Sequence, residues 1–264
     1  AWMHVKYALL DSNDGLVLAG RRIWFHFQRF PWDLDRKENN PCHGEQYRQV
    51  TRRLAMRLPD ACHAQVLKGE FHLGISPHML SYYHLITDLL PHLIMQHRFP
   101  VLVPEWLSSR FQSFLKECGF ALRVLPPGDY RVERLHIPAM PDEDWNTAKV
   151  QAVRDFMWKR FNLRSFTRPE KKRAYISRRR AGRRHLANED TLLPVFEGRG
   201  YQIMLLEKWS VRRQIDLFSN VTHLVAPHGA GLINAVFSPP EARILEIRPV
   251  VSSGDYCFDS LFGC

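Results

Sequence analysis

Thr222 to Asn234 has the composition of a phosphate-binding turn. It reads Thr-His-Leu-Val-Ala-Pro-His-Gly-Ala-Gly-Leu-Ile-Asn, an apolar strand followed by two glycines and a helix start. In an open parallel sheet, such a turn lies beyond the carboxyl ends of the strands, where glycine lets backbone amides approach a phosphate. Asn234 stands where a dinucleotide fingerprint has its third glycine, and Glu246 ends the next strand, roughly where an acid binds ribose hydroxyls. The alternatives are glycines that only let a helix pack on a strand and a His228 that serves as a cap or core residue.

Arginines gather just after the strand predicted at residues 173–177. A guanidinium group contacts two phosphate oxygens at once, so this loop could hold a diphosphate without a metal. From composition alone, a solvated basic loop and a nucleic-acid patch are equally good interpretations. The arginines are Arg178, Arg179, Arg180, Arg183 and Arg184.

His84 and Asp88 lie one helical turn apart in Ser-Tyr-Tyr-His-Leu-Ile-Thr-Asp, and therefore on one helix face. A histidine and a carboxylate in this arrangement can act as a general base and its orienting partner. The alternative is an ordinary ion pair on the helix surface.

The acidic triplets and the cysteines do not predict a metal site. Asp33-Leu-Asp35 lies in a loop rich in Pro and Trp, and Asp142-Glu-Asp144 resembles acids at a helix start. The cysteines are odd in number and irregularly spaced, which excludes a disulfide framework and favours reduced thiols in a reducing compartment. They are Cys42, Cys62, Cys118, Cys257 and Cys264.

The composition is that of a globular protein with a basic surface. The chain has 264 residues, 45% apolar and 24% charged, with a net charge of +10. These values exclude disorder and coiled coil, and no apolar run approaches the roughly 20 residues of a membrane helix. Residues 159–184 contain 12 basic residues and one acid. This imbalance predicts an anionic partner.

The secondary structure that would position these residues differs between the first and the second half of the chain. Short strands are predicted at residues 5–10, 16–27, 101–103 and 120–125, and helices at 81–99, 105–118 and 142–161. Pro91 should end or kink the first helix. The second half alternates strands at residues 173–177, 201–206, 222–226 and 243–247 with helices starting at 189, 210 and 229. This rhythm predicts a parallel, doubly wound α/β sheet, with domains at residues 1–150 and 151–264.

Seven motifs, taken together and in this order, resemble glycosyltransferase family 61, which includes plant core β-1,2-xylosyltransferase, protein O-mannose β-1,4-N-acetylglucosaminyltransferase and bacterial capsule enzymes. The resemblance is strong over about residues 174–249, fair over 81–91 and undetected over the first 75. The motifs are Tyr82-Tyr-His-Leu-Ile-Thr-Asp-Leu-Leu-Pro91, Ala174-Tyr-Ile-Ser-Arg178, Arg183-Arg-His-Leu-Ala-Asn-Glu189, Leu206-Glu-Lys-Trp-Ser210, Gln214-Ile-Asp-Leu-Phe218, Pro227-His-Gly-Ala-Gly-Leu-Ile-Asn234 and Leu245-Glu-Ile-Arg-Pro249.

The resemblance implies a GT-B-like enzyme with two Rossmann-type halves facing a cleft. Such an enzyme transfers a sugar from a nucleotide sugar with inversion, and members generally need no metal and no cofactor. The donor, expected to be UDP-linked, is a substrate. Family members usually continue with further helix, so a C-terminal closing element is expected to be missing here.

The residue roles follow from the resemblance together with the chemistry above. Arg178 and Arg183 are expected to bind the diphosphate, with Arg184 in reserve, and Asp88, His84 and His228 are the catalytic candidates. The first domain would supply the acceptor site and the base. The other expected donor-binding residues are Asn188, Glu207, Gly229, Ala230, Gly231, Asn234 and Glu246. For Asn188 and Asn234, the alternative to a polar contact with the donor is that they hold turns.

The expected acceptor is a glycan, a lipid-linked glycan or a glycoprotein, in cell-surface polysaccharide or glycoconjugate synthesis. The compact chain without a visible signal favours a bacterial, cytoplasmic enzyme whose basic surface contacts anionic membrane. A eukaryotic relative would work in the ER or Golgi lumen. The alternatives are a basic nucleic-acid-binding module, for which no recognised motif is found, and a catalytically inactive family member.

Overall fold

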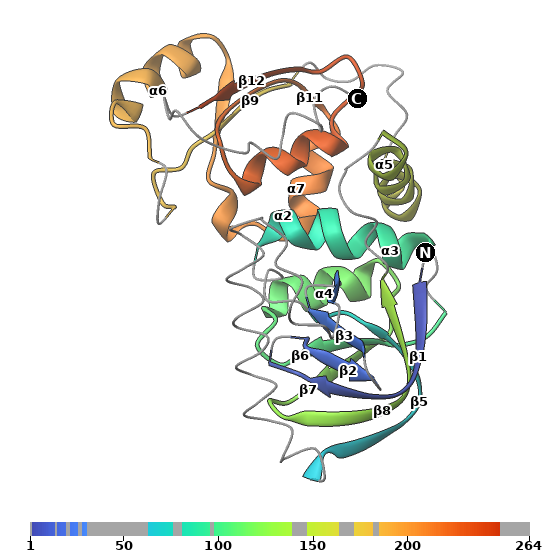
Figure 1. Ribbon diagram of the computed structural model, residues 1–264. Helices are drawn as coiled ribbons and strands as arrows, with labels where there is room; N and C mark the ends of the chain where they lie inside the picture. The colour runs from blue at the N-terminus through green and yellow to red at the C-terminus, as the bar shows by residue number, and fades with distance from the viewer. Residues whose placement is uncertain are drawn as a thin grey trace. The chain divides into compact units, whose positions relative to one another are not determined.

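The computed structural model describes residues 2–13, 15–19, 22–25, 28–30, 63–75, 81–95, 98–138, 147–163, 172–181 and 185–248. The protein is a mixed α/β molecule of two compact units (Figure 1). The first unit comprises Ala1–Leu80 and Met95–Glu143, and the second comprises Ser81–Ile94 and Asp144–Cys264. The second unit thus includes a helical segment from the region that was expected to belong to one domain of residues 1–150.

The first unit is built on a mixed sheet with the strand order β4-β3-β2-β1-β8-β5-β6-β7. Strands β5 to β8 pair in parallel, whereas β1 to β4 form an antiparallel meander that joins β8 through β1. This unit therefore differs from the parallel, doubly wound half that was expected. The strands are β1 (Trp2–Asp11), β2 (Val17–Ala19), β3 (Arg22–Phe25), β4 (Gln28–Phe30), β5 (Gln65–Leu73), β6 (Val101–Pro104), β7 (Leu122–Leu125) and β8 (Asp129–Pro138).

The expected helix between β6 and β7 is present as α4 (Ser109–Glu117). The Ser108 hydroxyl accepts the Phe111 amide at 3.4 Å, and Gly119 follows with φ +97°, a backbone angle that favours glycine. Phe111, Phe114 and Leu115 on this helix are buried. The helix predicted at residues 105–118 is therefore confirmed, although it begins four residues later, at Ser109.

Three histidines form one row across neighbouring strands of this sheet. His4 on β1 is paired in register with His136 on β8, which is paired with His72 on β5. The Nδ1 atoms of His4 and His136 are 2.5 Å apart, and His136 Nε2 lies 3.1 Å from the Glu70 carboxylate. Burial lowers the pKa of His136, which suits a neutral ring in this row.

The second unit contains a four-stranded parallel sheet with the order β10-β9-β11-β12, which confirms the predicted alternation of parallel strands and helices. The strands are β9 (Lys172–Ile176), β10 (Tyr201–Met204), β11 (Val221–Pro227) and β12 (Arg243–Ile247). The helices between them are α6 (Glu189–Gly198), η4 (Leu206–Lys208), α7 (Val211–Phe218) and η5 (Ala230–Phe237). The last is a 3₁₀ helix.

The strand order of this sheet reverses between β9 and β11. From β9 the chain continues to β10, which is the neighbour of β9 at one edge of the sheet. From β11 it continues to β12, which is at the opposite edge. Right-handed crossovers then place α6 on one face and α7 with η5 on the opposite face. The loops after β9 and β11 therefore diverge at the point where open α/β sheets bind their ligands.

The helix predicted at residues 81–99 forms as α2 (Tyr82–His84), η3 (Leu85–Leu89) and α3 (Leu90–Met95). The middle segment is a π-helix, and the Leu90 amide donates to the Leu85 carbonyl, five residues back. Pro91 has no amide hydrogen, and its ring would clash with the carbonyl four residues back in a regular helix. The wider π turn accommodates the proline, which therefore does not end the helix.

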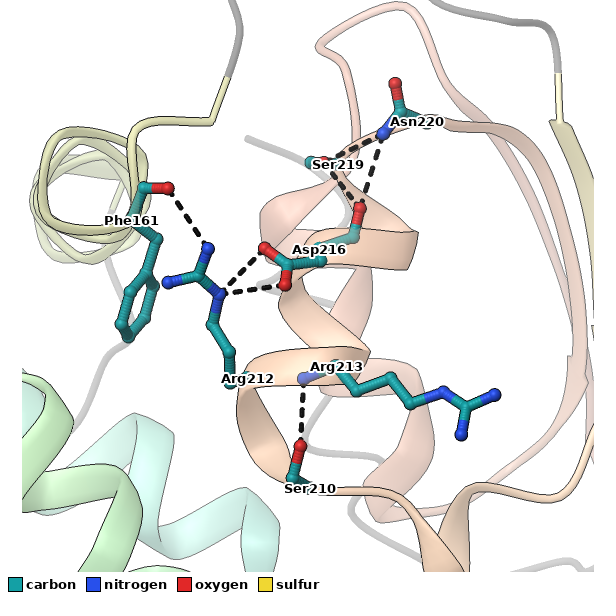
Figure 2. Close-up of polar contacts among 7 residues, drawn as sticks. All are labelled: Phe161, Ser210, Arg212, Arg213, Asp216, Ser219 and Asn220. Carbon is teal, nitrogen blue, oxygen red and sulfur yellow. Dashed lines mark hydrogen bonds and ion pairs between the residues drawn. The ribbon is translucent and has the colours of Figure 1, made fainter.

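Helix α5 (Thr147–Phe161) is attached to α7 through Arg212 (Figure 2). The Arg212 Nε atom donates to both oxygens of Asp216 at 2.8 Å, and its Nη2 atom donates to the Phe161 carbonyl at 3.2 Å. The guanidinium also lies 4.1 Å from the centre of the Phe161 ring. An arginine on the last carbonyls of a helix satisfies acceptors that the helix itself leaves open.

The start and end of α7 have their own hydrogen bonds (Figure 2). The Ser210 hydroxyl accepts the Arg213 amide at 3.2 Å, and Ser219 and Asn220 donate to the Asp216 carbonyl.

None of the helices within the described residues is both long enough and apolar enough to cross a membrane.

The histidine on α3 predicts a pH dependence of stability. His92 is 5% exposed, and burial, assisted by Lys149 on α5, lowers its pKa to about 4 from an ordinary value of 6.5. Between these values the unfolded chain binds the proton and the folded chain does not. The free energy of unfolding is therefore at its full value above about pH 6.5. It decreases as the pH falls toward 4, by about 3 kcal/mol at 1.36 kcal/mol per pKa unit.

Denaturant unfolding between pH 4 and pH 7 checks this prediction. The His92→Leu variant should lose stability less steeply than the parent as the pH falls, whereas His63→Leu, at an exposed position, should follow the parent. Parallel curves for the parent and His92→Leu would contradict it.

Candidate functional site

The centre of the candidate site is the contact between Arg178, just after β9, and Gly229, just after β11. A Cβ atom built on Gly229 would collide with the Arg178 guanidinium group. The missing side chain at Gly229 thus makes room for an arginine of the same unit. The two motifs that were expected to bind the diphosphate therefore meet at the point where the strand order reverses.

Gly231 serves a different purpose from Gly229. A Cβ atom at Gly231 would lie 3.3 Å from Ile176 Cγ2 and 3.4 Å from Leu206 Cδ1, both of which belong to the core. Its missing side chain therefore lets η5 pack closely on the sheet. For Gly231, the alternative interpretation of a glycine that lets a helix pack on a strand therefore fits the neighbouring atoms. The first amides of a helix, here including those of Ala230 and Gly231, have no partner within the helix.

His228 is held by Glu246 from the neighbouring strand. The His228 Nδ1 atom lies 2.6 Å from Glu246 Oε1, and the Arg248 Nε atom donates to Glu246 Oε2 at 2.7 Å. The side chains of His228 and Glu246 are 11% and 8% exposed. The expected role of Glu246 was ribose binding, but both of its oxygens contact protein groups. The contact at Nδ1 lets Glu246 set the orientation of the His228 ring.

Asn234 is a buried structural residue. Its side chain is fully buried, accepts the Tyr82 hydroxyl at 2.8 Å, and donates to Gln214 at 2.9 Å and to the Gly231 carbonyl at 3.0 Å. Gln214 in turn donates to the carbonyls of Leu206 and Trp209. The expected contact of Asn234 with the donor is not supported, because both of its amide hydrogens are used inside the protein.

His84 and Asp88 form the pair that their spacing predicted, in the second unit. The His84 Nδ1 atom lies 2.7 Å from Asp88 Oδ2, and the Thr87 hydroxyl donates to Asp88 Oδ1 at 2.6 Å. Both side chains stay partly exposed, at 34% and 23%. Because Tyr82 of the same helix contacts Asn234 on η5, this pair belongs to the second unit. It was expected to belong to the first domain.

The remaining expected donor-binding residues are less informative. Asn188 precedes α6, but its side chain makes no capping hydrogen bond, and the helix start uses its carbonyl, which accepts from Thr191. Glu207 is exposed on η4, after β10. Arg183, Arg184 and both acidic triplets lie outside the described residues. Within the described part of the chain, no group of three or more His, Cys, Asp or Glu side chains could hold a metal.

Two groups of side chains at this site are not predicted by the sequence pattern. Tyr82 and Gln214 were noted only as motif letters, although a polar residue inside an apolar helix pattern is a signal for a buried hydrogen bond. Glu189 is predicted only as the first residue of a helix, but its side chain is buried against Tyr175 and the Arg178 amide.

The sequence matches one known protein family. The sequence model of the Glycosyltransferase 61 family matches residues 82–245, which is more than half of the chain. The matched region begins at Tyr82, continues through Arg178, Gln214 and the His228 turn, and ends in β12. No curated protein matches the chain. From the extent of this match, the chain belongs to glycosyltransferase family 61 and is a glycosyltransferase.

Proposed function

We propose that this protein is an inverting glycosyltransferase that transfers a sugar from a nucleotide sugar to a hydroxyl group of a glycan or another acceptor. The observation that carries the proposal is the contact of Arg178 with the Gly229 turn where the strand order reverses. Open α/β sheets bind nucleotides at such a point, and arginine is the side chain best matched to a diphosphate.

The donor diphosphate would bind between Arg178 and the start of η5. The guanidinium offers two parallel N–H groups to phosphate oxygens, and the amides of Gly229, Ala230 and Gly231 offer further donors at a helix start. His228 stands next to these amides, with its Nδ1 atom held by Glu246. When the ring carries a proton on both nitrogens, its Nε2–H can donate to the charge that develops on the leaving diphosphate.

The acceptor hydroxyl would attack the anomeric carbon from the face opposite the diphosphate. The new carbon–oxygen bond forms as the bond between the sugar and the diphosphate breaks, and the hydroxyl proton passes to a base. We propose His84 as that base, because the Asp88 carboxylate at its Nδ1 atom can orient the ring and stabilise it once it has taken up the proton. Asp88, whose two oxygens accept from Thr87 and contact His84, would orient the ring.

We propose UDP as the nucleotide and cell-surface polysaccharide or glycoconjugate synthesis as the setting, with a glycan, lipid-linked glycan or glycoprotein as acceptor. No metal is part of the proposal, since cationic and amide groups supply the charge stabilisation that a metal gives in other transferases. The net charge of +10 would also suit contact with an anionic membrane that carries a lipid-linked acceptor.

The first prediction from this proposal concerns Arg178. Arg178→Ala should weaken UDP binding by about 1.5–3 kcal/mol, the scale of a hydrogen bond to a charged group, and leave the fold intact. Isothermal titration in the presence of EDTA measures it. Arg243→Ala removes the same charge from the amino end of β12, away from the strand ends of the site, and should bind UDP like the parent. Equal losses in both variants, or tight binding of short RNA in place of UDP, would support a charge-driven nucleic-acid module.

The second prediction concerns the space at Gly229. Gly229→Ala should displace the Arg178 guanidinium and weaken UDP binding about as much as Arg178→Ala, because the new Cβ occupies the position of the guanidinium. Gly198→Ala is the matched control, since a Cβ there has no atom within 4 Å. Binding by Gly229→Ala at the parent's affinity would contradict the proposed geometry.

The third prediction separates the two histidines. His84→Ala should lower turnover by roughly 10²–10⁴-fold, the range for loss of a general base, with unchanged UDP affinity. His228→Ala should lower both turnover and UDP affinity. UDP release from a panel of UDP-sugars and glycan acceptors, with titration of UDP on the same preparations, measures both. A His228→Ala variant that loses only stability would show that this histidine is a helix cap, for which about 1 kcal/mol is typical.

A further inference from the structure

One buried carboxylate beside the candidate site has no role in the proposed reaction. Glu189 is the first residue of α6 and is 5% exposed. Burial of a carboxylate is expensive unless hydrogen bonds compensate for the lost water. The N-terminal end of a helix favours a negative charge, which accounts for part of that compensation.

The rest of the compensation for burying this carboxylate comes from two hydrogen-bond donors that share one oxygen of Glu189. The Tyr175 hydroxyl on β9 donates to Oε1 at 2.9 Å, and the Arg178 amide donates to the same atom at 3.3 Å. Burial, with the hydrogen bond to Glu189, raises the pKa of Tyr175, so that its hydroxyl keeps its proton at neutral pH. The Tyr175 ring stacks on Phe196 of α6, with ring centres 4.4 Å apart. Glu189 therefore connects α6 to the end of β9.

The backbone of Arg178 is held on both sides. Its amide donates to Glu189, and its carbonyl accepts from the Ala181 amide at 2.9 Å. From this backbone the guanidinium extends to the space above Gly229. A change in the backbone at Arg178 would move the guanidinium away from the Gly229 turn, because the side chain starts from that point.

We infer that Glu189 is a positioning residue for donor binding, whose buried carboxylate holds the backbone of Arg178 so that the guanidinium faces the phosphate position at Gly229. The inference rests on the proposed function of Arg178. It assigns to Glu189 a role that acts through Arg178 and needs no contact with the substrate.

A double-mutant cycle with UDP as the probe tests this inference. Glu189→Ala should weaken UDP binding about tenfold, which corresponds to about 1.4 kcal/mol. In the Arg178→Ala background, the same substitution should cost less than twofold, because the arginine that it positions is absent. A tenfold loss in both backgrounds would overturn the inference and show that Glu189 affects the site without Arg178.

Three further variants separate positioning from simple destabilisation. Glu189→Gln keeps an oxygen acceptor at the same place and should bind UDP within about threefold of the parent. Tyr175→Phe removes the other donor to Glu189 and should weaken UDP binding less than Glu189→Ala does. Asp190→Ala changes the neighbouring acid, which is exposed and pairs with Arg179, and should leave UDP binding unchanged. A loss in Glu189→Gln as large as in Glu189→Ala would overturn the inference.

Hydrogen exchange of the Arg178 amide gives a readout that needs no ligand. The amide should exchange at least tenfold faster in Glu189→Ala than in the parent and in Glu189→Gln, with the amides of β11 unchanged. Unchanged exchange at Arg178 would overturn the inference even if UDP binds as proposed. If the parent binds no UDP, the proposed function fails, and the exchange rates still decide whether Glu189 holds this turn.

Discussion

The buried amide of Asn234 is the interaction on which the second unit depends. It joins three segments that are far apart in the chain: Tyr82 at the start of the 82–95 helix, Gln214 on α7 and the Gly231 carbonyl on η5. Leaving a buried polar group without its hydrogen bond costs about 1–3 kcal/mol. This one side chain therefore sets where the helix with His84 and Asp88 lies relative to the Gly229 turn.

The close approach of Arg178 to Gly229 depends on that arrangement. Asn234 fixes the start of η5, and Gly231 lets η5 lie close to Ile176, the residue at the end of β9. The turn at Gly229 is then near enough to the end of β9 that only a residue without a side chain leaves room for the arginine. The two glycines of one motif thus have separate tasks, one in packing and one in shaping the site.

Two histidine–carboxylate pairs lie in the second unit, and each engages the Nδ1 atom of its histidine. His84 pairs with Asp88 along one helix, and His228 pairs with Glu246 between the ends of two strands. The first pair is partly exposed, whereas the second is nearly buried. A base must be accessible to the substrate from which it takes a proton, so the pair of His84 and Asp88 suits this role. The second pair suits a fixed hydrogen-bond donor, because Glu246, which accepts from Arg248, holds the ring in place.

The local pattern of the sequence determined the second unit well. Alternating apolar strands and short helices predicted the parallel sheet, and the motifs of family 61 identified the same segment, because both signals come from residues that are close in the chain. The first unit was harder. Strands β5 and β8 carry register shifts between Leu67 and Glu70, so their buried positions do not alternate regularly and no strand was predicted there.

Only the tertiary structure decided what each candidate residue contacts. The sequence indicated Glu246 as a ribose contact and left Asn234 open between a donor contact and a turn, whereas Glu246 holds His228 and Asn234 ties three helices together. It also placed residues 1–150 in one domain, although residues 81–94 pack with the second unit. The physical reason is the same in each case: a hydrogen bond or a buried contact between residues 18 to 152 positions apart leaves no periodic trace in the chain, because either partner alone looks like an ordinary polar residue.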